Sequence, residues 1–242
     1  MLAPIRRTQF SDDGPSLRAV PCGQGVIDVA PLLAPRQRTH LSTLACRLHL
    51  PARMVLYREA SAAQWVFIVD SGVLKAFQDL PSGKRRITAF LFAEDLFGLS
   101  EGDRYVNTLQ TITPVNLFKI PRAALHDALR RDPELEFHFL CKLTHELRKS
   151  QRHTVLVSRR DAAGRLAMFL RMLEQHGLQR SSDSTIGFPM SRSDAANYLG
   201  LSLETVSRAC RALERNGIVA FTDRNNVRVL DRQRFEKLAA RM

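Results

Sequence analysis

The chain has 242 residues, 45% of them hydrophobic and 25% charged, a composition typical of a folded globular protein that excludes a disordered or collagen-like chain. The formal charge is +12, and residues 142–242 alone carry +9, whereas residues 61–141 carry −1. A basic half of this kind suits a polyanionic partner such as DNA, although a solvated basic surface would give the same counts.

No apolar run approaches the roughly 18 residues that a membrane span needs, and Met1–Phe10 lacks the apolar stretch of a secretory signal. The four cysteines, at positions 22, 46, 141 and 210, are few and widely separated. We therefore expect a cytoplasmic protein without a membrane partner.

Residues 1–31 are rich in Pro, Gly and Asp and show little periodicity, which predicts an irregular N-terminal arm. Helical spacing follows at Leu41, Leu44, Ala45 and Leu48, so we expect a short helix that ends before Pro51.

Residues 52–120 alternate runs of β-branched and aromatic residues with turn signals such as Ser71-Gly72 and Thr113-Pro114. This spacing predicts an antiparallel sandwich or barrel. The expected strands are Met54–Tyr57, Trp65–Val69, Val73–Phe77, Ile87–Phe92, Val106–Ile112 and Val115–Ile120.

After Pro121 the period becomes helical, with a short helix expected at Ala124–Arg131 and a long one from Pro133 to about Arg160. Steps of three and four along the long helix define a heptad-like seam of Leu140, Leu143, Leu147, Ser150, Thr154 and Val157. We interpret the seam as a dimer interface, because the helix is longer than a small β domain can cover. The alternative is a helix packed on its own domain.

The C-terminal third predicts three capped helices and a hairpin. Asp161 begins a helix with an apolar stripe of Leu166, Phe169, Leu170 and Leu173 that ends at Gly177. Ser191 begins a second helix, which ends at Gly200, and Ser202 begins a third, Leu203–Arg215. The runs Ile218–Phe221 and Val227–Leu230 would then form a two-stranded wing. This is the pattern of a winged helix-turn-helix.

The third helix divides into two faces. Val206, Ala209, Cys210 and Leu213 fall on the inner side, whereas Glu204, Ser207, Arg208 and Arg211 fall on the outer side. An arginine can donate two bonds to guanine and a glutamate can accept from cytosine, so the outer face is a candidate major-groove reader. A solvent-exposed ion pair is the alternative. Candidates for contacts to the DNA backbone are Arg192, Ser202, Thr205, Arg211 and Arg228.

The run Leu203-Glu204-Thr205-Val206-Ser207-Arg208 resembles the recognition helix of the CRP/FNR superfamily of bacterial transcription regulators. The resemblance implies an α+β fold: an N-terminal antiparallel β-roll (a double-stranded β-helix like that of cyclic-nucleotide-binding domains), a long dimerisation helix and a C-terminal winged helix-turn-helix. The corresponding segments are residues 1–31 (arm), 32–132 (β-roll), 133–160 (dimerisation helix) and 161–242 (winged helix).

The Glu-x-x-Ser-Arg pattern resembles the FNR and FixK branch, which implies TTGA-like half-sites read by Glu204, Ser207 and Arg208. The resemblance also implies a homodimer on a near-palindromic double-stranded operator, with RNA polymerase as a further partner. It leaves open which genes are regulated and in which direction.

The cyclic-nucleotide cassette of the superfamily is altered here. Leu99 follows Gly98 where those members have Glu, and Tyr105 follows Arg104 where they have Ser or Ala. The cysteines are too far apart for an iron–sulfur cluster, which needs several closely spaced thiolates. We therefore predict no cofactor and no metal site.

Three alternatives stay open at this point. One is a regulator gated by haem or another small effector, because histidine can bind haem iron and the chain has histidines at positions 40, 49, 126, 138, 145, 153 and 176. Cys210 is either an inert small hydrophobe or a redox switch. The most remote alternative is an enzyme that uses the winged helix for protein interaction, since the chain shows no nucleophile–base pair, phosphate loop or metal signature.

Overall fold

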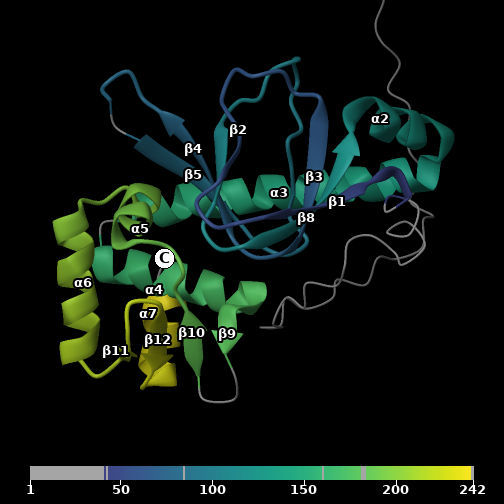
Figure 1. The fold of residues 1–242 in the computed structure, drawn as a ribbon. Helices are drawn as coiled ribbons and strands as arrows, with labels where there is room; N and C mark the ends of the chain where they lie inside the picture. The colour runs from purple at the N-terminus through teal and green to yellow at the C-terminus, as the bar shows by residue number, and fades with distance from the viewer. Residues whose placement is uncertain (1–40, 42, 84, 160, 181–183, 241–242) are drawn as a thin grey trace, which may run out of the picture. The chain divides into compact units, whose positions relative to one another are not determined.

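The computed structural model describes residues 41, 43–83, 85–159, 161–180 and 184–240, and the predicted N-terminal arm lies outside them. Within these residues the chain runs from a β-roll through a long helix to a winged helix-turn-helix, as predicted (Figure 1).

The β-roll consists of two antiparallel sheets. One has the order β1-β8-β3-β6 and the other β2-β7-β4-β5. Phe67 and Leu117 from the first sheet share one apolar cluster with Leu74 and Leu109 from the second, so the sheets pack face to face. The strands are β1 (Cys46–Leu50), β2 (Val55–Tyr57), β3 (Trp65–Ser71), β4 (Leu74–Asp79), β5 (Arg85–Leu91), β6 (Leu96–Phe97), β7 (Thr108–Thr111) and β8 (Val115–Pro121).

The six strands expected from residues 52–120 all form, with ends shifted by a few residues. The expected helix is present at the described residues Leu41, Thr43 and Leu44, but its continuation to Leu50 is wrong, because Cys46–Leu50 is strand β1, paired antiparallel with β8 from Lys119 back to Val115. Leu48 and Leu50 face inward while Arg47 and His49 are exposed, a period-two pattern that the helical spacing of the leucines obscured. Pairing with a distant strand outweighs the local helical period.

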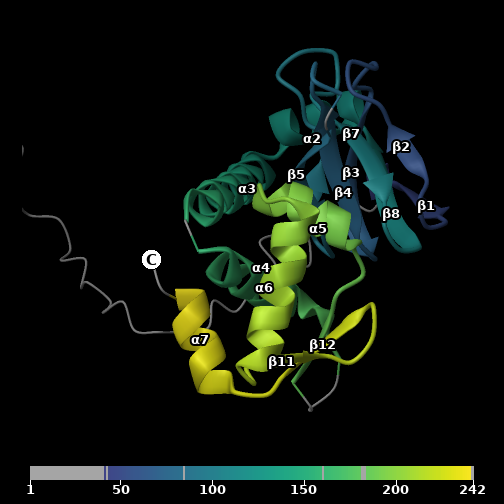
Figure 2. The ribbon, with the colours of Figure 1, turned by 90° about the vertical axis from the view of Figure 1, so that its left-hand side faces the viewer.

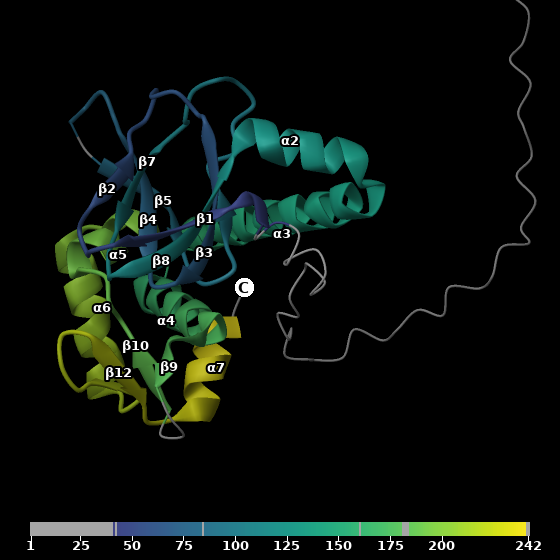
Figure 3. The ribbon, with the colours of Figure 1, turned by 45° about the vertical axis from the view of Figure 1, so that its right-hand side comes forward.

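Two helices follow the roll, α2 (Arg122–Arg131) and α3 (Pro133–Ser158). The Asp132 carboxylate caps α3 by accepting from the backbone N–H groups of Glu134 and Leu135, at 3.1 and 3.0 Å. Leu125, Leu135 and Phe139 pack with Val66 and Ile120 of the roll in a second apolar cluster. Figure 3 shows α2 and α3 side by side along the roll.

The winged helix begins with α4 (Ala162–Leu173), whose first turn is capped by Asp161. Its predicted stripe of Leu166, Phe169, Leu170 and Leu173 is fully buried. The chain continues through a short turn, η1 (Glu174–Leu178), in which His176 and Gly177 have non-helical backbone angles, so the helix breaks at the expected glycine, with Gly177 at φ +74°. The remaining elements are β9 (Gln179–Arg180), β10 (Thr185–Gly187), α5 (Arg192–Leu199), α6 (Leu203–Arg215), β11 (Val219–Phe221), β12 (Asn226–Val229) and α7 (Arg232–Ala240).

The wing is larger than predicted. The hairpin β11–β12 forms as expected, but β12 also pairs with β10, and β10 with β9, which the sequence reading did not include. Helix α7 was also not predicted, although Phe235 is fully buried against the domain core. No helix among the described residues combines the length and apolar character that a bilayer crossing requires.

The apolar core of the winged helix continues into the β-roll. Phe77 of β4 and Phe90 of β5 belong to the same cluster as Phe169 of α4 and Leu213 of α6. The β4–β5 side of the roll therefore supports the helix-turn-helix directly.

Candidate nucleic-acid interface

Helices α5 and α6 are joined by a tight turn whose geometry the sequence specifies locally. The Ser191 hydroxyl accepts from the backbone N–H of Asp194 at 3.0 Å, and the Ser202 hydroxyl accepts from that of Thr205 at 3.1 Å. Gly200 ends α5 at φ +63°, a conformation that suits glycine. Two capped helices are thus held at a fixed turn, as a helix-turn-helix requires.

Helix α6 separates its residues as predicted. Val206, Ala209, Cys210 and Leu213 are buried. On the outer face, the Glu204 and Arg208 side chains are 77% and 66% exposed and form an ion pair at 3.5 Å. Such an exposed pair contributes little to stability, so both side chains are available to a ligand. Figure 2 shows α6 facing the viewer with no other element in front of it.

The other predicted contacts surround these two. Arg211 is exposed on α6, Arg228 is exposed on β12 of the wing, and Ser202 is exposed at the start of α6. Thr205 is half-buried, with its hydroxyl 2.8 Å from that of Ser202. Ser207 donates to the Leu203 carbonyl at 2.9 Å, which leaves its oxygen able to accept from a base.

Arg192 is placed differently from the other backbone candidates. Its guanidinium lies 4.0 Å from the ring centroid of Phe221 and 4.8 Å from that of Phe188, and Nη1 is 3.2 Å from Cys210 Sγ. The side chain is half-buried and ties α5 to the wing. Its contacts are those of a residue that supports the interface from within.

Cys210 is buried beneath the outer face of α6. Burial raises the pKa of its thiol, and the nearby Arg192 guanidinium opposes that shift. Of the other cysteines, Cys46 is exposed on β1 and Cys141 is half-buried on α3, while Cys22 lies outside the described residues.

The long helix α3 presents an apolar row to solvent. Leu140 and Leu147 are 55% and 59% exposed, Leu143 is at 36%, and Phe137 and Val155 extend the row at either end. Ser150 and Thr154 of the predicted seam are exposed as well. Val157 instead packs partly against the core of the winged helix.

Inside the β-roll, aromatic rings fill the region next to the altered cassette. The Tyr105 ring stacks on that of Tyr57, with centroids 3.7 Å apart, and Phe67 and Phe97 continue the stack. The Tyr105 hydroxyl donates to the Trp65 carbonyl at 2.9 Å and accepts from the Trp65 N–H at 3.2 Å. Arg104 donates to the Ala60 carbonyl at 2.7 Å. Both cassette residues are thus engaged by the protein itself.

Sequence reasoning missed the contacts that join the roll and α3 to the winged helix. Lys75 of β4 pairs with Asp194 of α5, and His153 of α3 contacts Tyr198 of α5. A further ion pair joins the roll to α3: the buried carboxylate of Asp95, in the roll, pairs with Lys149 of α3. These partners are far apart in the sequence, and no local pattern marks them.

Comparison with protein-family models gives two matches. Residues 47–132 match the cyclic nucleotide-binding domain, and residues 164–238 match the Crp-like helix-turn-helix domain. Together the matches span the β-roll and the winged helix.

Similar proteins and structures agree with these matches. The chain is 30% identical over 213 residues to the transcriptional activatory protein AadR of Rhodopseudomonas palustris, covering 86% of this chain and 87% of that protein. It is 31% identical to the nitrogen fixation regulation protein FixK of Bradyrhizobium diazoefficiens, covering 81% and 83%. The structure of FixK2 from Bradyrhizobium japonicum matches with a TM-score of 0.75 and 30% identity, over 82% of this chain and 98% of that one.

Proposed function

The chain belongs to the CRP/FNR superfamily of transcription regulators, in its FixK-like branch, and from this we propose that it binds a TTGA-like palindrome as a homodimer without a small effector. The observation that carries the proposal is the division of α6 into a buried inner face and an exposed Glu204–Arg208 pair. Glu204, Ser207 and Arg208 read base edges in the major groove.

The exposed leucines of α3 support the homodimer. Leu140, Leu143 and Leu147 form one apolar row on a long helix, and a second copy of the row is the partner that buries it. The two α6 helices then enter successive major grooves about one helical turn apart, which makes the operator a near-palindrome. Ser202, Thr205, Arg211 and Arg228 contact the backbone and add affinity without sequence information.

Two features support regulation without a small effector. The Tyr57 and Tyr105 rings stack inside the roll, and the Tyr105 hydroxyl is bonded to the Trp65 backbone, so this part of the altered cassette is engaged by the protein itself. The described cysteines stand on β1, α3 and α6, an arrangement that does not fit a cluster bound by several neighbouring thiolates. The relatives named as transcriptional activators suggest that RNA polymerase is the further partner on the promoter.

The test is selection of duplexes from a random pool by the full chain. We expect enrichment of a two-fold symmetric site with TTGA-like halves, and sedimentation of the complex as two chains per duplex. Enrichment of a single asymmetric half, or of no sequence, would contradict the proposal. An absorption spectrum of the fresh protein with a Soret band would favour a haem-gated regulator instead.

A further inference from the structure

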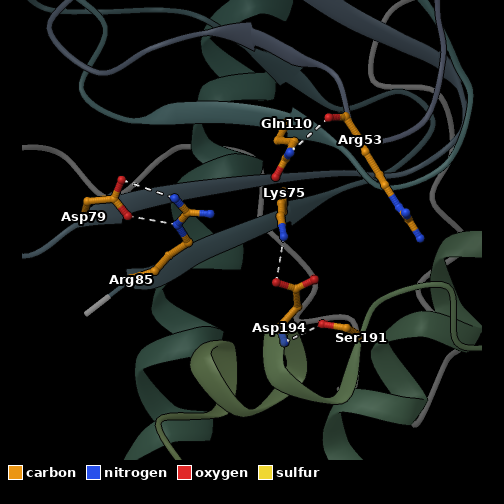
Figure 4. A network of polar contacts seen from close by, with 7 residues as sticks. All are labelled: Arg53, Lys75, Asp79, Arg85, Gln110, Ser191 and Asp194. Carbon is orange, nitrogen blue, oxygen red and sulfur yellow. Dashed lines mark hydrogen bonds and ion pairs between the residues drawn. The ribbon is translucent and has the colours of Figure 1, made fainter. Parts of the chain in front are cut away.

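One ion pair joins the β-roll to the first helix of the helix-turn-helix. Lys75 Nζ lies 2.7 Å from Asp194 Oδ1, and the two side chains are only 13% and 16% exposed. Figure 4 shows Lys75 extending from β4 toward the start of α5. A charged hydrogen bond this shielded from water is directional and stronger than a surface pair.

Asp194 occupies the first turn of α5, where its backbone N–H donates to the cap residue Ser191. A carboxylate at this position also interacts favourably with the positive end of the helix dipole. Because α5 packs against α6, a contact that fixes the start of α5 also affects the direction of α6, the proposed DNA-reading helix.

A second contact holds the other end of α5. The Phe90 ring of β5 lies 5.0 Å from that of Tyr198 and 5.6 Å from that of Phe169. All three side chains are buried. Apolar contacts of this kind supply attraction but constrain direction weakly, since they are not directional. Lys75 and Asp194 supply a directional contact from the roll at the start of α5, whereas the hydrogen bond of His153 to the Tyr198 carbonyl comes from α3 at its other end.

The ion pair lines a cavity between the roll and the winged helix. Its volume is about 930 Å³, and its walls include Arg53 and Gln110 from the roll and Arg192 and Arg224 from the winged helix. On this side of the junction the two parts are therefore separated by open space, and the ion pair bridges it. Lys75 crosses this space to reach Asp194.

We propose that Lys75 is a positioning residue for DNA reading: through Asp194 it fixes the orientation of α5 and α6 on the β-roll, and thereby the spacing of half-sites that the dimer accepts. The proposal rests on the proposed function, because two reading helices must meet one operator. A change of one base pair between half-sites shifts and rotates one half-site relative to the other. A firmly held winged helix rejects that change, whereas a loosely held one tolerates it.

The experiment compares operators whose half-sites are at the selected spacing or one base pair nearer or farther. For each protein the ratio of Kd on the wrong spacing to Kd on the right one is measured by anisotropy at fixed salt. We expect Lys75→Met to reduce this ratio roughly five- to tenfold, within the range of direct pairwise couplings. Lys75→Arg keeps the charge and restores the wild-type ratio.

Asp194→Asn gives a second route to the same result. Asp194→Asn should lower the ratio of Kd on the wrong spacing to Kd on the right one, as Lys75→Met does. The double variant should lower this ratio little further. Arg47→Met is the matched control, since Arg47 pairs with Asp70 within the roll at 3.3 Å and its replacement also removes one positive charge. An unchanged ratio in Lys75→Met, or equal relaxation in Arg47→Met, would overturn the proposal.

Hydrogen exchange of the DNA-free protein separates this inference from the proposed function. Lys75→Met should speed exchange in α5 and leave β3 and β8 protected. If the wild type selects no palindrome, the proposed function fails while faster exchange in α5 still supports the anchoring role. Exchange in α5 that matches the wild type in both variants would refute that role.

Discussion

The imidazole of His153, on α3, stacks on the ring of Tyr198, on α5, with centroids 4.1 Å apart and planes 11° from parallel. His153 Nε2 also lies 2.8 Å from the Tyr198 carbonyl oxygen, a contact in which the ring N–H donates. One residue of the long helix thus holds the helix-turn-helix through both a ring stack and a hydrogen bond.

This contact predicts a pH dependence of stability. Burial lowers the pKa of His153 below its ordinary 6.5, the hydrogen bond to Tyr198 opposes the shift, and the charge of Arg86 adds to it. Burial also lowers the pKa of His176, whose ring lies 4.5 Å from that of Phe92. A depressed histidine pKa means that the unfolded chain binds more protons below about pH 6.5. The free energy of unfolding should therefore fall as the pH drops below about 6.5.

The measurement is urea unfolding of the full chain from about pH 7.5 to pH 5.5. His153→Phe keeps a ring against Tyr198 and removes one titrating group, so its stability should depend less steeply on pH. His126→Phe, on the exposed surface of α2, is the control and should keep the wild-type slope. An equal slope in all three proteins would remove His153 from the explanation.

The helix-turn-helix was predictable because its signals are local. Ser191, Ser202 and Gly200 each act within four residues of their own position, and the two faces of α6 follow from one helical period. Six of the strands from Val55 to Pro121 were predictable for a similar reason, since each run ends at its own turn signal, whereas the short strand β6 (Leu96–Phe97) was not predicted.

The rest depends on residues that are distant in sequence. Lys75 and Asp194 are 119 positions apart, and neither belongs to a motif. The helical expectation was wrong from Cys46 to Leu50, because β8, some 70 residues later, pairs with this segment as strand β1. At Tyr105 the departure from the family cassette was visible in the sequence, but its stacking on Tyr57 was not.

A charge in the exposed leucine row of α3 should disrupt the proposed dimer. We expect Leu143→Glu to sediment as a monomer, because the carboxylate would be buried without a partner between two α3 helices. The monomer itself should lose little stability, since Leu143 is already 36% exposed in the single chain. The control residue is Arg152, which is exposed on the opposite side of α3, and the Arg152→Glu protein should stay dimeric. A dimeric Leu143→Glu would show that another surface holds the two chains.

Cyclic AMP should not change the affinity of the protein for its operator. The rings of Tyr57 and Tyr105 stack on each other inside the roll, and Arg104 is bonded to the Ala60 carbonyl. An anisotropy titration with and without the nucleotide measures the coupling. A tenfold tightening, about 1.4 kcal/mol of coupling free energy, would mean that the stack opens to admit a ligand.

Thiol reactivity should follow exposure. Cys46 is exposed, whereas burial raises the pKa of Cys210 and lowers its thiolate fraction at neutral pH. In the folded protein we expect iodoacetamide to label Cys46 well before Cys210, and urea to abolish the difference. Mass spectrometry of digested samples over time measures both rates. Early labelling of Cys210, together with loss of operator binding, would instead support its role as a redox switch.

Arg208 provides the sharpest test of base reading. Its side chain is 66% exposed on α6, one turn after Glu204, and a guanidinium matches the two acceptors of guanine. Arg208→Ala should cost about 1–3 kcal/mol per half-site on a TTGA-type palindrome and much less on a scrambled duplex, because the backbone contacts remain. The fold should persist, since the buried face of Val206, Cys210 and Leu213 is untouched.

Arg228→Ala, on the wing, should weaken binding to both duplexes alike. It should also lower the salt slope by roughly one for each phosphate that the wing no longer neutralises. Paired titrations of both variants at several salt concentrations distinguish the two roles. If Arg208→Ala weakens binding equally on both duplexes, Arg208 contacts the backbone and the bases are read by another face.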